Sequence, residues 1–508
     1  MFNKKFYIGN KKFLFMFTHK PYYADENIIV MGFPYNMIPQ SFNENQVNNI
    51  KGYYTYIRYN QDNITIINDI LGNYRIYYME MDNIIYFSNN FLYLFNMLPK
   101  AEREPNKFEI EYWMKHRYTT GGETLCTKIH KIKPAHIYKF SNTQTEERLY
   151  FKDIKNTPNR KKHFEEVLTD LRNTVSLIKK MPQKKFLLFS GGADSTLCVK
   201  LLQEQGVEFI PVFAKHTPTN SMNYDDILKV QYSAKILGIA PIEIEIDTTK
   251  AIDANIIDTM FTDRSITQLF FDIAKKIKNE FGENIILLNG QAADSIFAFG
   301  PTGQSIGASM ARNMLFNPCK PINCIFYEIA KFINPIFKDF RMPKNYTEYL
   351  NSFFDEKFYI PIIEKHKSKN YFKQITNIII RIQKLIKNKF SLLMYLKIYS
   401  FMQGSDNYVN VQNCEYYGIK SLFLYGTQEI IYSTIKNTDY IYEIYHPKSV
   451  VYKILKDVFN YKMPNIKNKK NYKREIKQEK TFRQYEQEVY QNFYNKINSL
   501  EFADEGNK

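Results

Sequence analysis

The sequence predicts an α/β protein of 508 residues, with a β-rich N-terminal part and a parallel-sheet C-terminal part. Short apolar alternations separated by turn signals dominate residues 1 to about 150, which is typical of antiparallel strands. After Pro182, short apolar runs alternate with segments of helical spacing, as in a doubly wound parallel sheet. The chain is also longer than one hydrophobic core usually supports, so we expect more than one domain.

The strands expected in the N-terminal part are short and alternate apolar with polar residues. They are the segments 54–59, 63–69, 75–81, 84–89 and 135–140. Turn-forming residues separate them, for example Gly72-Asn73. We therefore predict a first domain over residues 1–150.

In the second half of the chain, the spacing of apolar residues changes from strand-like alternation to a helical period. A polar patch at 152–163 precedes a helical pattern, so residues 151–180 are expected to form a linker and a helix. Buried strands are then expected at 185–189, 207–213 and 284–289, with helices at 195–205 and 224–238. Gly206 and Gly238 stand where glycines end helices. The pattern is mainly helical from 320 to 460. We predict a second domain over 181–465 and a charged tail over 466–508.

Composition narrows the function classes. The net charge of +17 is large, but lysines are scattered rather than clustered in stripes, which argues against nucleic-acid binding. The cysteines are odd in number and widely spaced, which indicates a reducing compartment without disulfides or zinc; they are Cys126, Cys198, Cys319, Cys324 and Cys414. Residues 375–402 are apolar but are interrupted by basic residues at amphipathic spacing, so no membrane span is expected. We predict a cytoplasmic protein.

A glycine-rich loop joins the first expected strand of the second domain to a helix. The sequence FLLFSGGADSTLCV places Ser190, Gly191 and Gly192 before the helix, with Asp194 and Ser195 at its start. Backbone N–H groups at a helix N-terminus, approached closely through glycines, form an anion site. A carboxylate beside phosphates makes sense as a Mg²⁺ ligand, since the cation bridges carboxylate and phosphate oxygens. This is not a Walker loop, because no GxxxxGK[ST] is present.

The loop resembles the SGGxDS pyrophosphate loop (PP-loop) of the N-type ATP pyrophosphatases. A second stretch, NGQAADS, resembles the SGxGxDE motif of the asparagine synthetase family within that class. The resemblance implies a PP-loop (HUP-like) domain with added helices, preceded by an Ntn-hydrolase-like (αββα) amidotransferase domain. It places Asp294 as the second Mg²⁺ ligand and Asn289 with Gly290 against the nucleotide. Gln291 and Ser295 depart from the family, which has acids at both positions.

The N-terminal residues also depart from the family pattern. Family glutaminases use a cysteine directly after the initiator methionine as nucleophile, and here that residue is Phe2. Asn89 stands where the family's F-A-S-E motif has glutamate. We expect glutamine hydrolysis to be lost, as in the β-lactam synthetases and lasso-peptide cyclases, which this chain resembles in type.

The resemblance implies an AMP-forming carbon–nitrogen ligase that activates a carboxylate as acyl-adenylate and transfers ammonia or a substrate amine. The expected cofactors are ATP and Mg²⁺, the expected substrate is a small-molecule or peptide carboxylate, and a homodimer is left open. Lys469 and Lys470 are candidates for the family's late catalytic lysine, or simply part of a solvated lysine-rich stretch. The expected ATP-binding residues are Leu188, Ser190, Gly191, Gly192, Asp194, Ser195, Val212, Asn289 and Gly290; the expected metal ligands are Asp194 and Asp294. Two alternatives remain: a tRNA-modifying PP-loop enzyme and a catalytically inactive scaffold homologue.

Overall fold

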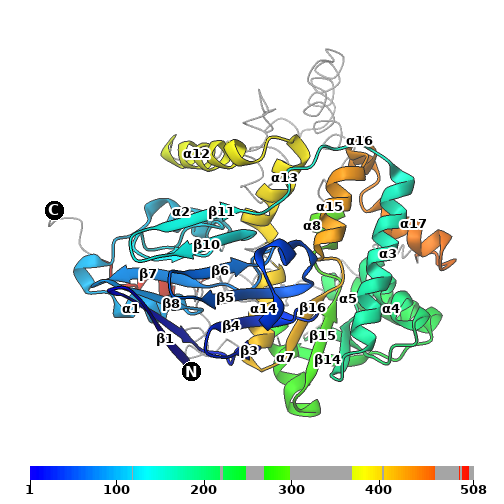
Figure 1. The fold of residues 1–508 in the computed structure, drawn as a ribbon. Helices are drawn as coiled ribbons and strands as arrows, with labels where there is room; N and C mark the ends of the chain where they lie inside the picture. Colours follow the sequence, from blue (N-terminus) through cyan, green and yellow to red (C-terminus); the bar gives the residue numbers. More distant parts are fainter. Residues whose placement is uncertain are drawn as a thin grey trace.

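The computed structural model describes most of both expected parts of the chain. The described residues are 1–116, 118–217, 221–247, 268–297, 369–402, 406–463, 491 and 495–502. The fold is mixed α/β, with two sheets in the N-terminal half and a parallel sheet in the C-terminal half (Figure 1). This confirms the predicted fold class.

The N-terminal half contains two packed sheets. The first has the strand order β1-β2-β8-β7-β9 and the second the order β11-β10-β6-β5-β4-β3. The strands are β1 (Phe2–Ile8), β2 (Lys11–Phe17), β3 (Tyr23–Ala24), β4 (Ile28–Pro34), β5 (Gly52–Tyr59), β6 (Ile64–Asn68), β7 (Tyr77–Met81), β8 (Ile84–Ser88), β9 (His130–Lys131), β10 (His136–Phe140) and β11 (Thr145–Leu149). All neighbours are antiparallel except the parallel pair β2 and β8.

Aromatic side chains fill the space between the two sheets. Phe140 of the second sheet lies 5.2 Å from Phe87 and 5.4 Å from Tyr78 of the first, between ring centroids. Helices α1 (Phe91–Met97) and α2 (Lys107–His116) cover the outer face of the first sheet through a separate apolar cluster. On the outer face of the second sheet, the 3-10 helices η1 (Pro39–Ser41) and η2 (Glu44–Asn49) flank Phe42, whose ring packs 4.7 Å from that of Tyr56.

The C-terminal sheet is parallel, with the order β14-β13-β12-β15-β16. Its strands are β12 (Lys184–Leu188), β13 (Ile210–Thr217), β14 (Ile242–Asp247), β15 (Ile285–Asn289) and β16 (Lys420–Phe423). The chain starts in the middle at β12, builds outward through β13 and β14, and returns to the other side of β12 with β15. The strand order therefore reverses between β12 and β15, where doubly wound sheets place ligands.

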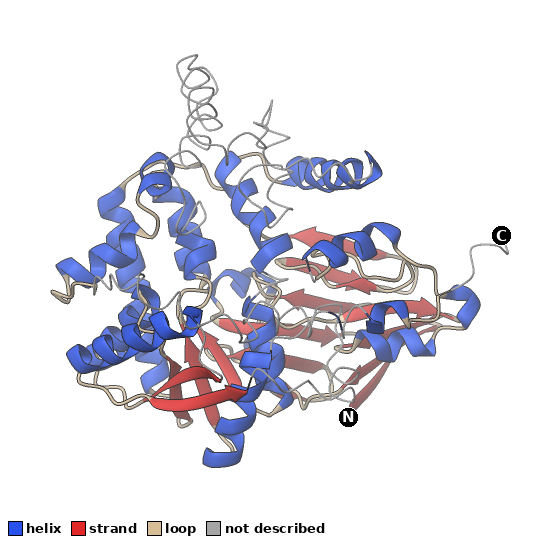
Figure 2. Ribbon diagram, turned by 180° about the vertical axis from the view of Figure 1, so that it is seen from behind, coloured by secondary structure: helices blue, strands red, loops and turns tan. Residues whose placement is uncertain are grey.

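Helices lie on both sides of this sheet (Figure 2). The described α-helices of the C-terminal half are α3 (Arg160–Lys179), α4 (Ala193–Glu204), α5 (Ser221–Leu237), α7 (Gln268–Phe281), α8 (Ala293–Phe297), α12 (Lys369–Leu385), α13 (Lys389–Lys397), α14 (Asp406–Tyr416), α15 (Gln428–Asn437), α16 (Tyr440–Tyr445) and α17 (Ser449–Asp457). Of these, α12 packs on α2 of the N-terminal half. Helices α3, α4, α15 and α17 pack together, whereas α7 and α14 pack against each other. None of the described helices is long and apolar enough to cross a membrane.

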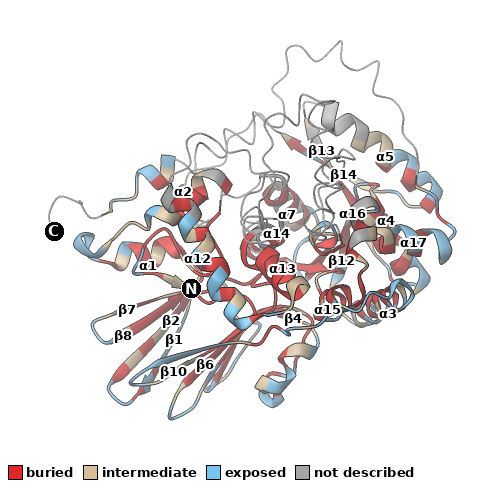
Figure 3. Ribbon diagram, turned by 90° about the horizontal axis from the view of Figure 1, so that it is seen from above, coloured by how far each residue is buried: buried red, intermediate tan, exposed pale blue. Residues whose placement is uncertain are grey.

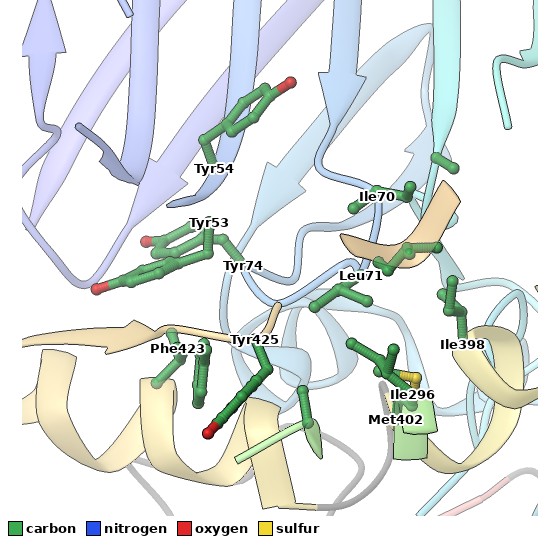
Figure 4. Close-up of a cluster of buried hydrophobic side chains, with 14 of the residues drawn as sticks. Tyr53, Tyr54, Ile70, Leu71, Tyr74, Ile296, Ile398, Met402, Phe423 and Tyr425 are labelled. Carbon is green, nitrogen blue, oxygen red and sulfur yellow. The ribbon is translucent and has the colours of Figure 1, made fainter. Parts of the chain in front are cut away.

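The two halves meet over a buried surface (Figure 3). Lys51, just before β5, forms an ion pair with Asp170 of α3, and Thr427 donates a 2.5 Å hydrogen bond to the other oxygen of Asp170. Tyr53 Oη donates a 2.5 Å hydrogen bond to Glu415 at the end of α14. Apolar side chains from both halves fill the space beside these contacts (Figure 4), so the N-terminal sheets and the parallel sheet share one continuous core.

Several sequence expectations are confirmed and some need correction. Gly206 and Gly238 end α4 and α5 with φ of +62° and +64°. β13 continues to Thr217, four residues beyond its expected end, because β14 pairs with it along that whole length. β16 is a strand inside the region expected to be mainly helical. The boundaries 1–150, 151–180, 181–465 and 466–508 stay predictions.

Candidate active site at the carboxyl ends of β12 and β15

The predicted pyrophosphate loop lies at the switch point of the parallel sheet, between β12 and α4. Gly191 has φ of +67°, and a Cβ there would lie 2.6 Å from the backbone carbon of Lys229 in α5. Glycine is therefore required at this position. Gly192 is the N-cap of α4 and provides no side-chain cap, so the first-turn N–H groups keep their capacity to bind an anion.

The two serines of this loop have different surroundings. Ser195 is buried, and its hydroxyl donates to the Gly192 carbonyl at 3.2 Å while accepting from the Ser190 N–H at 3.3 Å. Ser190 is exposed, with its Oγ 3.3 Å from that of Ser195. Ser195 thus stabilises the loop, and the exposed Ser190 accepts from the Gly192 N–H at 3.4 Å through its Oγ.

The second predicted loop follows β15, next to the first. Asn289 is buried; its side-chain oxygen accepts from the Gln291 N–H at 3.0 Å, and its amide donates to Ser421 Oγ at 3.3 Å. A Cβ on Gly290 would lie 3.2 Å from the Cβ of Asp194. The small residue at 290 allows the two loops to touch. Residue Ala292, with φ of +73°, then turns the chain into α8.

The closest ionic contact of the site was not predicted from the sequence. Lys448 Nζ lies 2.6 Å from Asp194 Oδ2 and 2.6 Å from Asp294 Oδ1, so one ammonium bridges both predicted metal ligands. The Lys448 and Asp194 side chains are 11% and 19% exposed, whereas Asp294 is 60% exposed. Lys448 precedes α17, which packs on α4. The structure therefore brings three charged groups together from three separate segments.

Burial and charge act against each other at these groups. Burial raises the pKa of Asp194; the Lys448 charge lowers it and the Asp294 charge raises it, with a net rise. Burial alone would lower the pKa of Lys448, but both carboxylates raise it, and the net direction is upward. Lys448 therefore stays a cation in the folded protein.

The carboxylates fit a divalent cation. Asp194 Oδ1 is buried and accepts no hydrogen bond from any described residue. A buried carboxylate oxygen without a partner is costly, and Mg²⁺ prefers such oxygens together with phosphate oxygens. Across the described segments, no group of three or more His, Cys, Asp and Glu residues could hold a metal. The two aspartates would therefore need phosphate or water oxygens to complete a coordination shell.

The remaining predicted site residues are placed as follows. Leu188 and Val212 are neighbours on adjacent strands, but Val212 is buried in the core of the sheet. Lys469 and Lys470 lie outside the described residues. Ser295 is half-buried on α8, and its carbonyl accepts from Lys397 Nζ at 2.9 Å. The sequence signal that could have found Lys448 is slight: a lone lysine between Pro447 and an amphipathic helix.

A cavity of about 700 Å³ lies beside this site, between the start of α3 and helices α16 and α17. Lys448 lines it and separates it from the two aspartates. Rings and basic groups form much of its wall, including Arg160, whose guanidinium carbon lies 3.5 Å from the ring centre of Tyr442. Glu443, also in the wall, is buried and accepts from the Ser449 N–H at 3.1 Å. Burial raises the pKa of Glu443 to about 7.

The N-terminal half has no comparable arrangement around Phe2. Phe2 opens β1, pairs with Phe17 of β2, and stacks on its ring at 6.4 Å. Asn89 is buried, and its side chain binds Thr18 through hydrogen bonds of 2.8 and 2.9 Å. An apolar ring therefore occupies position 2, and the nearby Asn89 amide is already hydrogen-bonded.

Comparison with known proteins covers part of the chain. Residues 181–315 match the asparagine synthase family model. No curated protein gives a match. Similar solved structures include a U34-tRNA thiolase from Methanococcus maripaludis (13% identity, 47% of this chain and 77% of that chain, TM-score 0.21). Others are an NMN synthetase from Francisella tularensis (11%, 48% and 93%, 0.21) and a glutamine-dependent NAD+ synthetase from Acinetobacter baumannii (14%, 71% and 80%, 0.19).

These TM-scores are too low for the solved structures to support an argument about this chain. The family match, by contrast, begins just before β12, and it contains both the glycine loop and the loop that bears Asp294. Both motifs that carried the resemblance therefore lie inside the matched range. Residues 181–315 of this chain are thus similar to the asparagine synthase family.

Proposed function

We propose that the chain is an ATP-dependent, AMP-forming carbon–nitrogen ligase. The observation that carries the proposal is the meeting of Asp194, Asp294 and Lys448 at the start of α4, beside a glycine loop that can bind phosphate. Two carboxylates, one ammonium and free helix N–H groups suit a triphosphate bound with a divalent cation. The family match over 181–315 supports this reaction class.

In the proposed reaction, a carboxylate oxygen of the substrate attacks the α-phosphorus of ATP. The bond from that phosphorus to the bridging oxygen breaks, and pyrophosphate leaves. Ammonia or a substrate amine then attacks the acyl carbon, AMP leaves, and the nitrogen loses a proton as the amide forms. The N–H groups of the loop and the Lys448 ammonium stabilise the charge that moves onto pyrophosphate.

Asp194 and Asp294 are the residues that would hold Mg²⁺, through their carboxylate oxygens. When bound, the cation would supply charge neutralisation for the phosphates. Gly191, Gly192 and Ser190 would orient the phosphates, while Ser195 keeps the loop in shape. We propose Leu188 as a contact of the adenine; Val212, which is buried, would support it from the core.

The nitrogen source follows from the N-terminal half. We propose that the chain does not hydrolyse glutamine, because Phe2 has no nucleophilic atom and packs on Phe17. The reacting nitrogen would come from ammonia or an amine-bearing cosubstrate. The cavity beside Lys448, of about 700 Å³, offers room for one of the two organic substrates.

Exchange of labelled pyrophosphate into ATP tests the proposal. Wild-type protein is assayed with Mg²⁺ and a panel of small and peptide carboxylic acids, and acid-dependent exchange is expected with at least one class. Binding of ATP with Mg²⁺ is measured in parallel by calorimetry. Absence of nucleotide binding would overturn the proposal and favour an inactive scaffold.

A further inference from the structure

The position of the Lys448 ammonium has a consequence for how a cation enters the site. The ammonium lies 2.6 Å from one oxygen of each aspartate, in the space between the two carboxylates. Among the described residues, Asp194 Oδ1 is buried and has no hydrogen-bond partner. A divalent cation that uses both carboxylates must therefore approach an ammonium or replace it.

The backbone holds Lys448 at this position. Its φ of +59° and ψ of +32° are left-handed, which is uncommon for a residue other than glycine. Its carbonyl accepts from the N–H groups of Val451 and Tyr452 at 3.0 and 3.2 Å. Val451 and Ile454 anchor α17 in the core. The side chain of Lys448 thus starts from a fixed point, and only its methylene chain can move.

The charges of the site balance differently with and without a nucleotide. Two carboxylates and one ammonium leave a net charge of −1, which attracts a divalent cation weakly. The phosphates of a nucleotide add several negative charges and offer the ammonium a second partner. Moving the ammonium onto phosphate would then free Asp194 Oδ2 and Asp294 Oδ1 for the cation.

We propose that Lys448 makes divalent-cation binding depend on the nucleotide: in the free protein its ammonium takes the place of the cation between Asp194 and Asp294. This inference rests on the proposed function, because it assumes that the phosphates bind at the glycine loop. Lys448 would act both as a substitute for the metal in the free site and as a phosphate ligand in the loaded site. The free protein then avoids binding a bare cation that would block the site.

Binding of Mn²⁺, followed by electron paramagnetic resonance, tests this inference. The wild-type protein is titrated with Mn²⁺ alone and with Mn²⁺ plus α,β-methylene-ATP, which cannot be cleaved at the bond in question. We expect binding to be at least about 10-fold tighter with the nucleotide analogue, after correction for free Mn²⁺–nucleotide. This comparison needs no variant.

Replacing Lys448 by methionine (Lys448→Met) should strengthen the binding of Mn²⁺ in the absence of nucleotide. Removing the ammonium leaves two uncompensated carboxylates, so Mn²⁺ alone should bind at least about 10-fold more tightly than to wild type. MgCl₂ without nucleotide should also raise the melting temperature of this variant more than that of wild type. Lys448→Arg keeps the charge and should bind Mn²⁺ alone as weakly as wild type does.

Lys453→Met is the matched control, because Lys453 lies on α17, which Lys448 precedes, and lines the same cavity but pairs with Asp457 at 2.5 Å. It should leave Mn²⁺ binding unchanged. Equal Mn²⁺ affinity of wild type with and without the analogue would overturn the inference while leaving the proposed function standing. Failure of wild type to bind the nucleotide under any condition would instead contradict the proposed function.

Discussion

The amino-terminal end of β1 and the carboxyl end of β12 are the two places where the family resemblance predicts chemistry, and they differ in how their polar groups are used. At β1, Phe2 stacks on Phe17, and the nearby Asn89 amide is hydrogen-bonded to Thr18. At β12, by contrast, Asp194 Oδ1 is buried without a hydrogen-bond partner in the part of the chain that the structure describes. The side-chain amide of the first region is paired, whereas the second region keeps a buried carboxylate oxygen that could accept a ligand.

The comparison shows that a likeness in sequence does not tell which site retains its chemistry. Unpartnered buried polar atoms are costly and persist mainly where function requires them. An apolar contact such as that of Phe2 with Phe17 contributes to stability instead. We therefore read the N-terminal half as a scaffold whose contacts support the site in the C-terminal half.

The largest expected effect is on the aspartates. Asp194→Asn and Asp294→Asn should each reduce ATP–pyrophosphate exchange by at least about 100-fold, because each loses a carboxylate that balances the charge of cation and phosphates. Circular dichroism and thermal melting should show an intact fold. Glu283→Gln, which removes an exposed carboxylate paired with Lys278, is the control and should retain exchange. Exchange near the wild-type rate in both site variants would contradict the assignment.

The N-terminal counterpart should change stability rather than catalysis. Phe2→Ala removes a ring that packs on the core and should lower the free energy of unfolding by about 1 to 2 kcal/mol. Exchange at a temperature where the variant is folded should remain within about twofold of wild type. Neither protein should release glutamate from glutamine, with or without ATP. Glutamate release in step with AMP formation would show that the N-terminal half is more than a scaffold.

Local patterns were sufficient to predict the glycine loop, half of the described strands and the ends of α4 and α5. Gly191 could be predicted because the loop before α4 turns through a left-handed residue, and Gly206 because a left-handed residue ends α4. Both are requirements of the local backbone. The doubly wound parallel sheet could be predicted from the alternation of strands and helices, which depends on segment type and not on long-range contacts.

Lys448 could not be predicted, because its role depends on tertiary structure. Nothing in HPKS distinguishes it from the other lysines of a basic chain, and it reaches Asp194 across 254 residues. β16 was missed for a related reason: four residues give too little periodicity, and the strand is defined by its pairing with β15. The length of β13 likewise follows from its pairing with β14.

Tyr425 lies between the helices that carry the two aspartates and the interface with the N-terminal half, so a variant can test whether this contact supports the site. Tyr425 is fully buried, donates a 2.9 Å hydrogen bond to the Asp194 carbonyl, and meets the ring of Phe297 of α8 edge-on at 5.8 Å. It therefore contacts both helices that carry the aspartates. Leu71 of the N-terminal half lies close to the neighbouring Gly426, where a Cβ would be 3.2 Å from Leu71 Cδ1 (Figure 4). Tyr425→Phe keeps the ring and removes the hydroxyl.

We expect Tyr425→Phe to lower the exchange rate about 3- to 10-fold, mainly through a higher KM for MgATP, with a stability loss of about 1 kcal/mol. Tyr461→Phe is the control, because the Tyr461 hydroxyl is buried but accepts and donates no hydrogen bond among the described residues. A loss of stability with an unchanged KM would mean that Tyr425 only supports packing.

Glu443 is expected to affect the pH dependence of stability. Burial disfavours the charge of its carboxyl group and raises the pKa to about 7. The ordinary value of 4.5 applies in the unfolded chain, so the folded protein binds this proton more tightly. Between pH 4.5 and 7 the unfolded state loses the proton first, and the free energy of unfolding falls as the pH rises.

Glu443→Gln removes that titration but keeps an oxygen acceptor for the Ser449 N–H. Relative to wild type, the variant should be equal in stability near pH 4 and more stable by about 2 kcal/mol at pH 8. Chemical denaturation at a series of pH values measures the difference, in which the titration of other buried groups cancels. A constant difference across this range would show that Glu443 is ionised in the folded protein, and that the wall of the cavity beside Lys448 carries a fixed negative charge.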